Sequence, residues 1–455
     1  MSIYRYAVPF FSVLFIVGCS TVKKARQAQT GTNRSPGETI ASAAQIGFPP
    51  GGRYALTNFE AVARTHHPSL FQARQNVESA RLQYRMTHSS RLPQITASGT
   101  YNRSTQNARR DTSTGMRGSW GGSLGLDLLL YDFGKLDAGE RQALESLIAA
   151  EEQLRETGLD VAYNVRAAFF EYHRSDELVR VAVESERQYA QHLEEARVMV
   201  EVGTRRRYDV TKAEVDLGNA RLTLITTSNA LINARAELNR SLGLAEQTAF
   251  DVGDGFLPPH PGSADTLMTT ARDNAPALAV LRARERAASA YVDQTIADLY
   301  PDLSLGANGD LSGRGFPLLW NFSWALRLTQ NLFDGHRKTA RIDEAVTQLR
   351  TARSRVADAE QTLYQNLVNA VAELESANKR LETSQLVRRQ TEENLAIVNE
   401  QYRVGVSSSI ERTDAQVALT QAQADVVRAR YDGQVACARI ARLTGEGTRE
   451  PEQTD

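Results

Sequence analysis

Few side chains in this 455-residue sequence are spaced for covalent or metal chemistry. The seven histidines include no H-x-x-x-H or H-E-x-x-H pair of the kind with which a helix holds zinc. A G-x-S-x-G motif begins at Gly121, but a nucleophilic serine of this type lies between a strand and a helix, and here a strand-like segment follows it. The sequence therefore predicts no enzyme, no cofactor and no metal site.

The surroundings of Cys19 indicate a covalent modification. The sequence Ile-Val-Gly-Cys-Ser, residues 16–20, follows an apolar stretch at residues 7–17 and resembles a bacterial lipobox. In such a motif the cysteine sulfur accepts diacylglycerol, and its amine accepts a third acyl chain after cleavage. We expect a lipoprotein signal peptide at residues 1–18, a lipidated Cys19 and a flexible linker at residues 19–53. The alternative is an ordinary signal peptide with an incidental cysteine.

The charge balance excludes a strongly basic nucleic-acid-binding protein. The chain has 53 Lys and Arg against 54 Asp and Glu, and its formal net charge is −1. Beyond the signal segment, no run approaches the ~20 apolar residues that a membrane-spanning helix needs. Any membrane crossing must therefore use strands.

The chain contains an internal duplication. The sequence around Pro68 returns around Pro276, an offset of 208, whereas Val202-Gly203 returns as Val404-Gly405, an offset of 202. A loop of variable length must account for this change of six residues. We expect a first repeat at residues 54–245, a linker at 246–265, a second repeat at 266–444 and a disordered tail at 445–455.

Each repeat contains three helical patterns. Pro68 and Pro276 open the first of them, to about residues 90 and 298. Apolar residues recur every seven positions through Lys135–Glu201 and Arg337–Arg403, which is typical of coiled-coil packing. At 1.5 Å per residue, such a helix is ~100 Å long. Glycine turns at Gly203 and Gly405 then reverse the chain into helices over about residues 207–243 and 409–443.

Two strand-like segments precede each long helix, within about residues 93–131 and 301–333. Trp320, Phe322 and Trp324 alternate with polar residues, as in an outer-membrane β-barrel. A soluble two-sided sheet would alternate in the same way, but all three tryptophans lie in these segments and the export signal favours the barrel. The turns that lead from the strands into the long helices are expected at Asp132, Gly134, Asp334 and Gly335.

This duplicated order of elements resembles the TolC family of outer-membrane efflux factors, and the lipobox resembles its lipoprotein branch. The resemblance covers about residues 54–444 and lies in the doubled layout more than in any short motif. It implies a mainly α-helical fold with a membrane β-barrel part. The long helices would form a coiled-coil tunnel, or α-barrel, and four strands per chain would complete a trimeric 12-stranded β-barrel. Four strands cannot close alone, because the smallest membrane barrels need eight.

The family implies a passive exit duct of a tripartite efflux or type I secretion system. Such a duct is a homotrimer in the outer membrane of a Gram-negative bacterium, in contact with outer-membrane lipid and without a nucleic-acid partner. It works with a periplasmic adaptor, also called a membrane fusion protein, and an inner-membrane pump. The alternative is a lipid-anchored periplasmic coiled-coil tether without a channel, which would not need tryptophan-rich strands.

The resemblance also implies a pore constriction just after the Val-Gly turns. Glu411 and Asp414 are three residues apart on one helix face, where the family carries paired acids, and Asp209 is the first-repeat counterpart of Glu411. Threefold symmetry would place six carboxylates from Glu411 and Asp414 around a cation-attracting pore. The alternative is an exposed acidic helix start that complements the helix dipole.

A latch closes the tip in this family. It joins the first-repeat acid, a tyrosine before the second turn and an arginine after that turn. Asp209 and Tyr402 match the acid and the tyrosine, but Ser407 stands where the arginine would be. We therefore expect either a weaker latch or the replacement of that arginine by Arg205, Arg206 or Arg207 from the other turn.

Overall fold

The computed structural model describes residues 52–105, 116–244, 251–257, 262–314 and 317–446, and also residues 22, 23, 25, 26, 28 and 29. The expected signal peptide, Cys19 and residues 447–455 lie outside the described residues. The chain divides into two compact units. One comprises residues 73–156 and 268–365, and the other comprises residues 1–72, 157–267 and 366–455.

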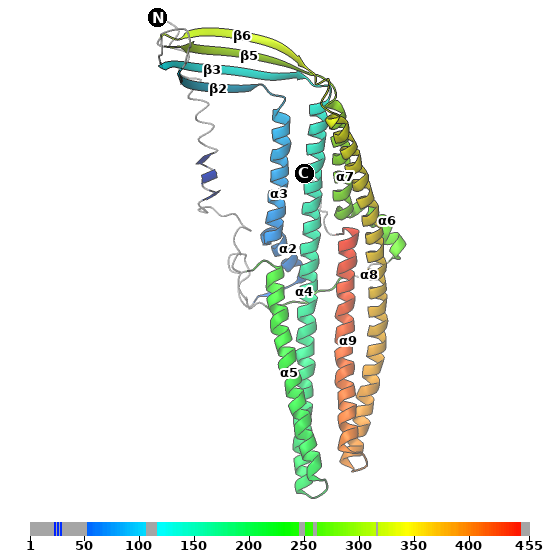
Figure 1. Cartoon of the computed structure of the whole chain (residues 1–455). Helices are drawn as coiled ribbons and strands as arrows, with labels where there is room; N and C mark the ends of the chain where they lie inside the picture. Colours follow the sequence, from blue (N-terminus) through cyan, green and yellow to red (C-terminus); the bar gives the residue numbers. More distant parts are fainter. Residues whose placement is uncertain are drawn as a thin grey trace, which may run out of the picture. The chain divides into compact units, whose positions relative to one another are not determined.

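The first of these units contains an antiparallel sheet (Figure 1). Its strand order is β2-β3-β5-β6, so the two repeats meet where β3 pairs with β5, and β2 and β6 form the edges. The strands are β2 (Gln94–Thr105), β3 (Met116–Tyr131), β5 (Asp302–Gly313) and β6 (Leu319–Thr329). The helices that flank them in the sequence are α3 (Pro68–Ser89), α4 (Lys135–Glu201), α7 (Pro276–Ala297) and α8 (Arg337–Arg403).

The register places apolar side chains of all four strands on one face. Leu126 pairs with Ile95 and with Ala307, and Ala307 pairs with Trp324. Because residues alternate across a strand, their sequence neighbours share the other face, which is polar. There the hydroxyls of Ser98 and Ser123 are 2.8 Å apart, and the Asn321 amide donates to Asp310 at 3.1 Å. The alternation seen in the sequence is confirmed as a two-faced sheet.

The change of length between the repeats lies in the strand region. Strands β2 and β5 begin and end at matching positions, so the change falls after Thr105 and Gly313. The connection is longer in the first repeat (residues 106–115) than in the second (residues 314–318). A bulge at Leu130 also shifts the register between β3 and β5. The expected variable loop is thus confirmed between the two strands of each pair.

Asp132 and Asp334 lie in the turns that lead from the strands into the long helices. Asp132 accepts hydrogen bonds from the backbone amides of Gly134 and Leu136. Asp334 accepts bonds from the first two amides of α8 at 3.1 and 3.2 Å. Gly134 and Gly335 have φ angles of 89° and 69°, a conformation that glycine adopts without strain. A carboxylate therefore caps the start of each long helix.

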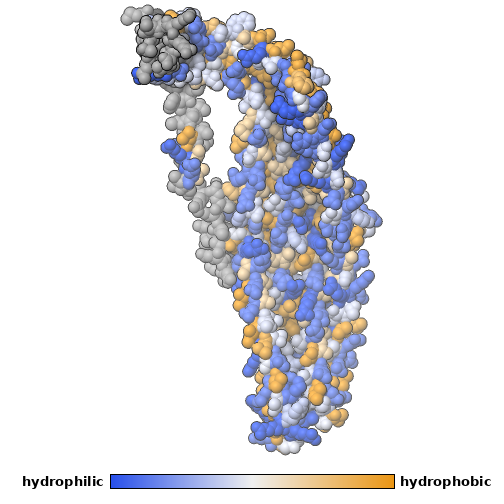
Figure 2. Space-filling view, viewed as in Figure 1, coloured by the Kyte–Doolittle hydropathy of each residue, from blue (hydrophilic) through white to orange (hydrophobic). Residues whose placement is uncertain are grey.

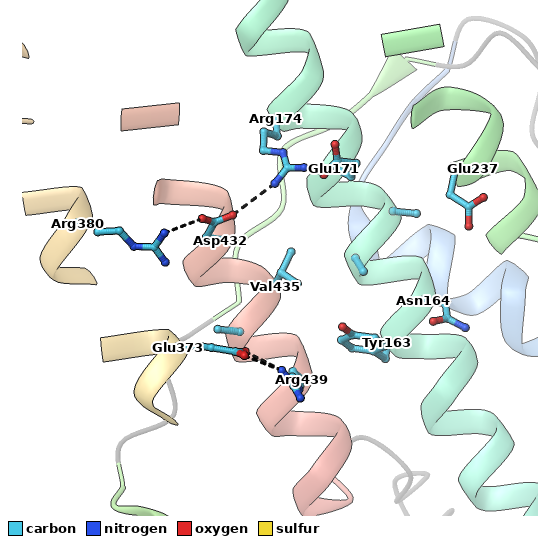
Figure 3. A pocket seen from close by; sticks show the side chains of 13 residues that line it. Tyr163, Asn164, Glu171, Arg174, Glu237, Glu373, Arg380, Asp432, Val435 and Arg439 are labelled. Atoms are coloured by element: carbon cyan, nitrogen blue, oxygen red, sulfur yellow. Dashed lines mark hydrogen bonds and ion pairs between the residues drawn. The ribbon is translucent and has the colours of Figure 1, made fainter. Parts of the chain in front are cut away.

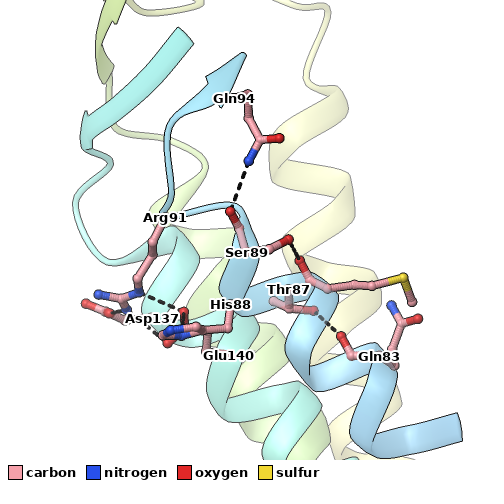
Figure 4. Close-up of polar contacts among 9 residues, drawn as sticks. Gln83, Thr87, His88, Ser89, Arg91, Gln94, Asp137 and Glu140 are labelled. Carbon is pink, nitrogen blue, oxygen red and sulfur yellow. Dashed lines mark hydrogen bonds and ion pairs between the residues drawn. The ribbon is translucent and has the colours of Figure 1, made fainter. Parts of the chain in front are cut away.

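The end of α3 is tied to the start of α4 by ion pairs (Figure 4). The Arg91 guanidinium donates to Glu140 at 2.7 and 3.0 Å and also pairs with Asp137. His88 Nδ1 lies 3.1 Å from the same Glu140. The Gln94 side chain at the start of β2 also donates to the Ser89 carbonyl at 3.0 Å. Together these contacts fix the direction in which the chain leaves α3.

The second unit is a helical bundle. Helix α5 (Arg207–Ser241) returns along α4, α9 (Ser409–Thr444) returns along α8, and α9 also lies beside α4 (Figure 1). Phe59, Phe169 and Phe170 are fully buried in its core. The remaining elements are α2 (Leu56–His66), α6 (Ala264–Asn274), and the parallel pair β1 (Arg53–Tyr54) and β4 (Asp251–Val252). Among the described residues, no helix is both long enough and apolar enough to span a bilayer.

Candidate functional site at the helical turns

Two equivalent turns connect the long helices to the returning helices. Gly203 and Gly405 have φ angles of 80° and 83°, which end α4 and α8 in a left-handed residue. The valines before them are largely exposed, at 71% for Val202 and 74% for Val404. Hydrophilic residues gather at this end of the bundle (Figure 2). The residues that the sequence predicts at the tip all lie in or beside these two turns: Asp209, Tyr402, Glu411 and Asp414.

The Tyr402 ring is the buried centre of the turn region. It is fully buried, with the Arg205 guanidinium 4.4 Å and the Arg412 guanidinium 5.0 Å from its centroid. Such contacts are cation–π interactions, which strengthen when water is excluded. Arg205 also donates to the carbonyls of Tyr402 and Ser407 at 2.9 and 3.1 Å. Of the three candidate arginines, Arg205 therefore contacts the tyrosine.

The Tyr402 hydroxyl and Asp209 are not joined within one chain. The hydroxyl is buried and has no hydrogen-bond partner among the described residues. Asp209 Oδ1 instead accepts a hydrogen bond from the Ser409 hydroxyl at 2.7 Å, and its Oδ2 accepts one from the Arg206 amide at 3.4 Å. The first turn is therefore linked to α9 through Ser409.

Glu411 caps its own helix. Its Oε2 accepts hydrogen bonds from the Ser407 hydroxyl and from the Ser408 amide, and the Ser408 hydroxyl accepts one from the Glu411 amide. This is a capping box, and the bonds from Ser407 and Ser408 lower the pKa of Glu411. Asp414, three residues on, is exposed.

His192 is a buried group that the sequence did not single out. It is 5% exposed, its Nδ1 lies 2.8 Å from the Arg412 guanidinium, and its ring meets the Tyr402 ring edge-on. Arg412 also donates to Glu195 at 2.7 Å. Burial and the adjacent Arg412 charge lower the pKa of His192 to about 4.

We expect the stability of the helical bundle to fall as the pH falls from about 6.5 to about 4. His192 is neutral in the folded chain in this window, whereas in the unfolded chain it binds a proton below its ordinary pKa. Proton binding therefore lowers the free energy of the unfolded state as the pH falls, and the free energy of unfolding decreases. Thermal unfolding of the parent and of His192→Gln should show a smaller loss of melting temperature in the variant over this range. Equal losses would contradict a titration at His192.

A charged pocket lies farther along the same unit (Figure 3). Asp432 pairs with Arg174 at 3.4 Å and with Arg380 at 3.5 Å, and Arg439 pairs with Glu373 at 2.8 Å. The pairs of Asp432 and of Arg439 hold α4, α8 and α9 together, and the other charged lining residues, Glu171 and Glu237, pair within their own helices. No group of three or more potential metal-ligating side chains occurs among the described residues.

The chain has two helical hairpins, one from each repeat, and a sheet with one apolar face. These features are typical of TolC-like outer-membrane factors. The model of the family "Outer membrane efflux protein" matches residues 61–244 and 267–446, and the chain belongs to this family. It is therefore an outer-membrane efflux protein, as the duplicated layout predicts.

Known proteins of this kind resemble the chain over most of its length. "Outer membrane protein OprJ" of Pseudomonas aeruginosa is 24% identical over 86% of this chain and 83% of its own length. "Probable outer membrane lipoprotein SilC" of Salmonella typhimurium is 22% identical over 85% of this chain and 84% of its own. The open-state structure of the outer membrane channel MtrE of Neisseria gonorrhoeae has a TM-score of 0.76 at 20% identity, covering 87% of this chain and 89% of MtrE.

Proposed function

We propose that three copies of this chain form a passive channel that serves as the exit duct of a tripartite exporter. The observation that carries this proposal is the four-stranded sheet, which has one apolar face, one polar face and two open edges. An adaptor would join the duct to an inner-membrane pump that supplies the energy, and the chain itself would catalyse no reaction. Its membership in an efflux family supports this role.

The edges of the sheet require partners in a membrane. Strands β2 and β6 each have one side without a neighbouring strand among the described residues, and unpaired backbone groups are costly in hydrocarbon. Pairing β6 of one protomer with β2 of the next would close a barrel of twelve strands. The apolar face would then contact lipid, and the polar face, with Asp310 and Asn321, would line the pore.

We further propose that the helical turns form the periplasmic tip. There Glu411 and Asp414 would contribute six carboxylates to a constriction, with Asp209 in the adjacent turn. Tyr402 would hold the tip closed through its contact with Arg205, which takes the place of the arginine that Ser407 replaces.

The N-terminal segments complete the proposal. Cys19 would carry the lipid after cleavage of residues 1–18, and residues 19–53 would link it to the folded repeats. The similarity to a protein described as an outer membrane lipoprotein supports this anchor. Residues 246–265 would join the two repeats, and residues 445–455 would form the tail.

Cation selectivity tests the proposed tip. We expect Glu411→Gln with Asp414→Asn to lower cation selectivity in planar bilayers and to weaken block by multivalent cations, because carboxylates concentrate cations at a narrow opening. Glutamine keeps a side-chain oxygen for the Ser408 cap. The matched control is Asp343→Asn with Glu344→Gln on α8, which should change neither property.

Two outcomes would contradict this proposal. Unchanged selectivity in the tip variant would show that the acids face away from the pore. A purified protein that is monomeric by native mass spectrometry and conducts no ions would favour the tether instead of the channel.

A further inference from the structure

We propose that Arg207 of one protomer pairs with Glu411 of its neighbour, at the joint where α5 of one protomer would lie on α8 of the next as α9 lies on α4 within each chain. This inference rests on the proposed trimer and identifies the residues of its helical joint. It follows from the internal duplication, because a ring of equivalent repeats needs the same contact between chains as within them.

The contact within one chain is polar and closely packed. Tyr431 on α9 donates to Glu177 on α4 at 2.7 Å, and the hydroxyls of Thr420 and Ser185 are 3.4 Å apart. Nearer the turns, Arg412 donates to Glu195. These bonds hold the second repeat against the first.

Apolar residues that are buried on α9 have exposed counterparts 202 positions away on α5. Ala424 and Val427 on α9 are 9% and 7% exposed, whereas their counterparts Leu222 and Ile225 on α5 are 63% and 56% exposed. On the opposite side of the contact, Ser185 of α4 is 8% exposed and its counterpart Val387 of α8 is 40% exposed. Apolar side chains on α5 and α8 are therefore left uncovered at the positions that are buried on α9 and α4.

A second copy of this chain fits the uncovered face of α5. Leu222, Ile225 and Ile232 follow the heptad spacing of a coiled-coil seam, and the face of α8 that the duplication places against them includes Val387 and Ile397. Burial of this apolar surface would stabilise the joint between protomers.

The duplication also defines one ion pair between protomers. Ser409 and Asp209, which are hydrogen-bonded within a chain, correspond to Arg207 and Glu411 at the next joint. Both are exposed. The capping bonds of Glu411 use Oε2, and Oε1 has no hydrogen-bond partner in the described part of the chain. The two oxygens of Asp209 also have different partners: Oδ2 caps the start of α5, and Oδ1 accepts a hydrogen bond from Ser409 of the other repeat.

Two of the other polar contacts near the turns have apolar counterparts at this joint, whereas the bond from Gln416 to Gln188 corresponds to Glu214 and Gln390. Arg412 and Glu195 correspond to Val210 and Ile397, and Thr420 and Ser185 correspond to Gly218 and Val387. The repeats of one chain are therefore held by several polar bonds, whereas neighbouring protomers would have fewer of them at the tip: the pair of Arg207 with Glu411 and a contact of Glu214 with Gln390. Opening of the tip would then separate protomers before it separates repeats.

Cysteine cross-linking tests the joint in the full-length protein purified in detergent. In a Cys437→Ala background, Gly218→Cys with Val387→Cys should form disulfides between chains and give dimers and trimers on a non-reducing gel. A side chain fits at Gly218, since an added Cβ meets nothing within 4 Å. The matched control, Ser185→Cys with Thr420→Cys, should form its disulfide within the chain and migrate as a monomer. A Gly218–Val387 variant that stays monomeric on the gel would overturn the inference.

The ion pair is tested by a double-mutant cycle in planar bilayers. Arg207→Ala should raise the open fraction of the channel about tenfold, since three pairs are lost together. In a Glu411→Gln background, which keeps the helix cap, the same change should have little effect. Arg206→Ala, at the adjacent exposed arginine, should show no such coupling. Equal effects of Arg207→Ala in both backgrounds would overturn the pair, whereas a protein that does not conduct at all would instead refute the proposed channel.

Discussion

Trp324→Arg should remove almost all of the assembled protein from the outer membrane, whereas Ser323→Arg should leave it assembled. Trp324 lies in the middle of β6 on the apolar face of the sheet, and its neighbour Ser323 points to the polar face. An arginine on the lipid-facing side of a barrel costs ~2–4 kcal/mol near the bilayer midplane. The cost applies three times in a trimer, while an arginine in the water-filled interior is tolerated.

The two substitutions are matched in depth and in charge, because the residues are adjacent in one strand. A third variant, Trp324→Leu, separates the loss of the ring from the gain of the charge and should assemble. The measurement is the amount of heat-resistant trimer in purified outer membranes. If Ser323→Arg is lost and Trp324→Arg is retained, the faces of the barrel are assigned the wrong way round.

The sequence predicts the long helices and the turns well because several signals agree there. The heptad pattern, the aspartate that caps each start and the glycine that ends each helix define Lys135–Glu201 and Arg337–Arg403, and the structure has these bounds. The duplication strengthens each prediction, because the same pattern occurs at the equivalent position of both repeats.

The short elements could not be predicted so directly. Leu56, Phe59 and Ala63 of α2 have the spacing of a buried helix face, but eleven residues are too few for a strong periodic signal. Strands β1 and β4 have two residues each and pair across the chain, so no local pattern defines them. Their formation depends on tertiary contacts.

The contacts at the tip were only partly predictable. The sequence places Tyr402 beside the second turn and three arginines in the first, but it does not determine which arginine reaches the ring. That choice depends on the path of the first turn, in which Arg205 donates to two carbonyls of the second. The burial of His192 next to Arg412 depends on how α9 packs against α4, which is also a tertiary property.

Tyr402→Ala should destabilise the tip strongly, whereas Tyr402→Phe should change it little. The latch of the family joins this tyrosine to an acid and an arginine. In the structure the ring makes the close contacts, and the hydroxyl has no hydrogen-bond partner among the described residues. Removal of a buried aromatic ring costs ~3–5 kcal/mol. Removal of a buried hydroxyl without a partner costs little, because no bond is lost.

The consequences of the two changes can be separated in planar bilayers and by thermal unfolding. Alanine should raise the open fraction and lower the melting temperature, because Arg205 and Arg412 lose the surface on which both guanidinium groups lie. Phenylalanine retains that surface and should match the parent in both measurements. If phenylalanine opens the channel as much as alanine does, the hydroxyl and not the ring holds the tip closed, and the cation–π contacts of Tyr402 do not carry the latch.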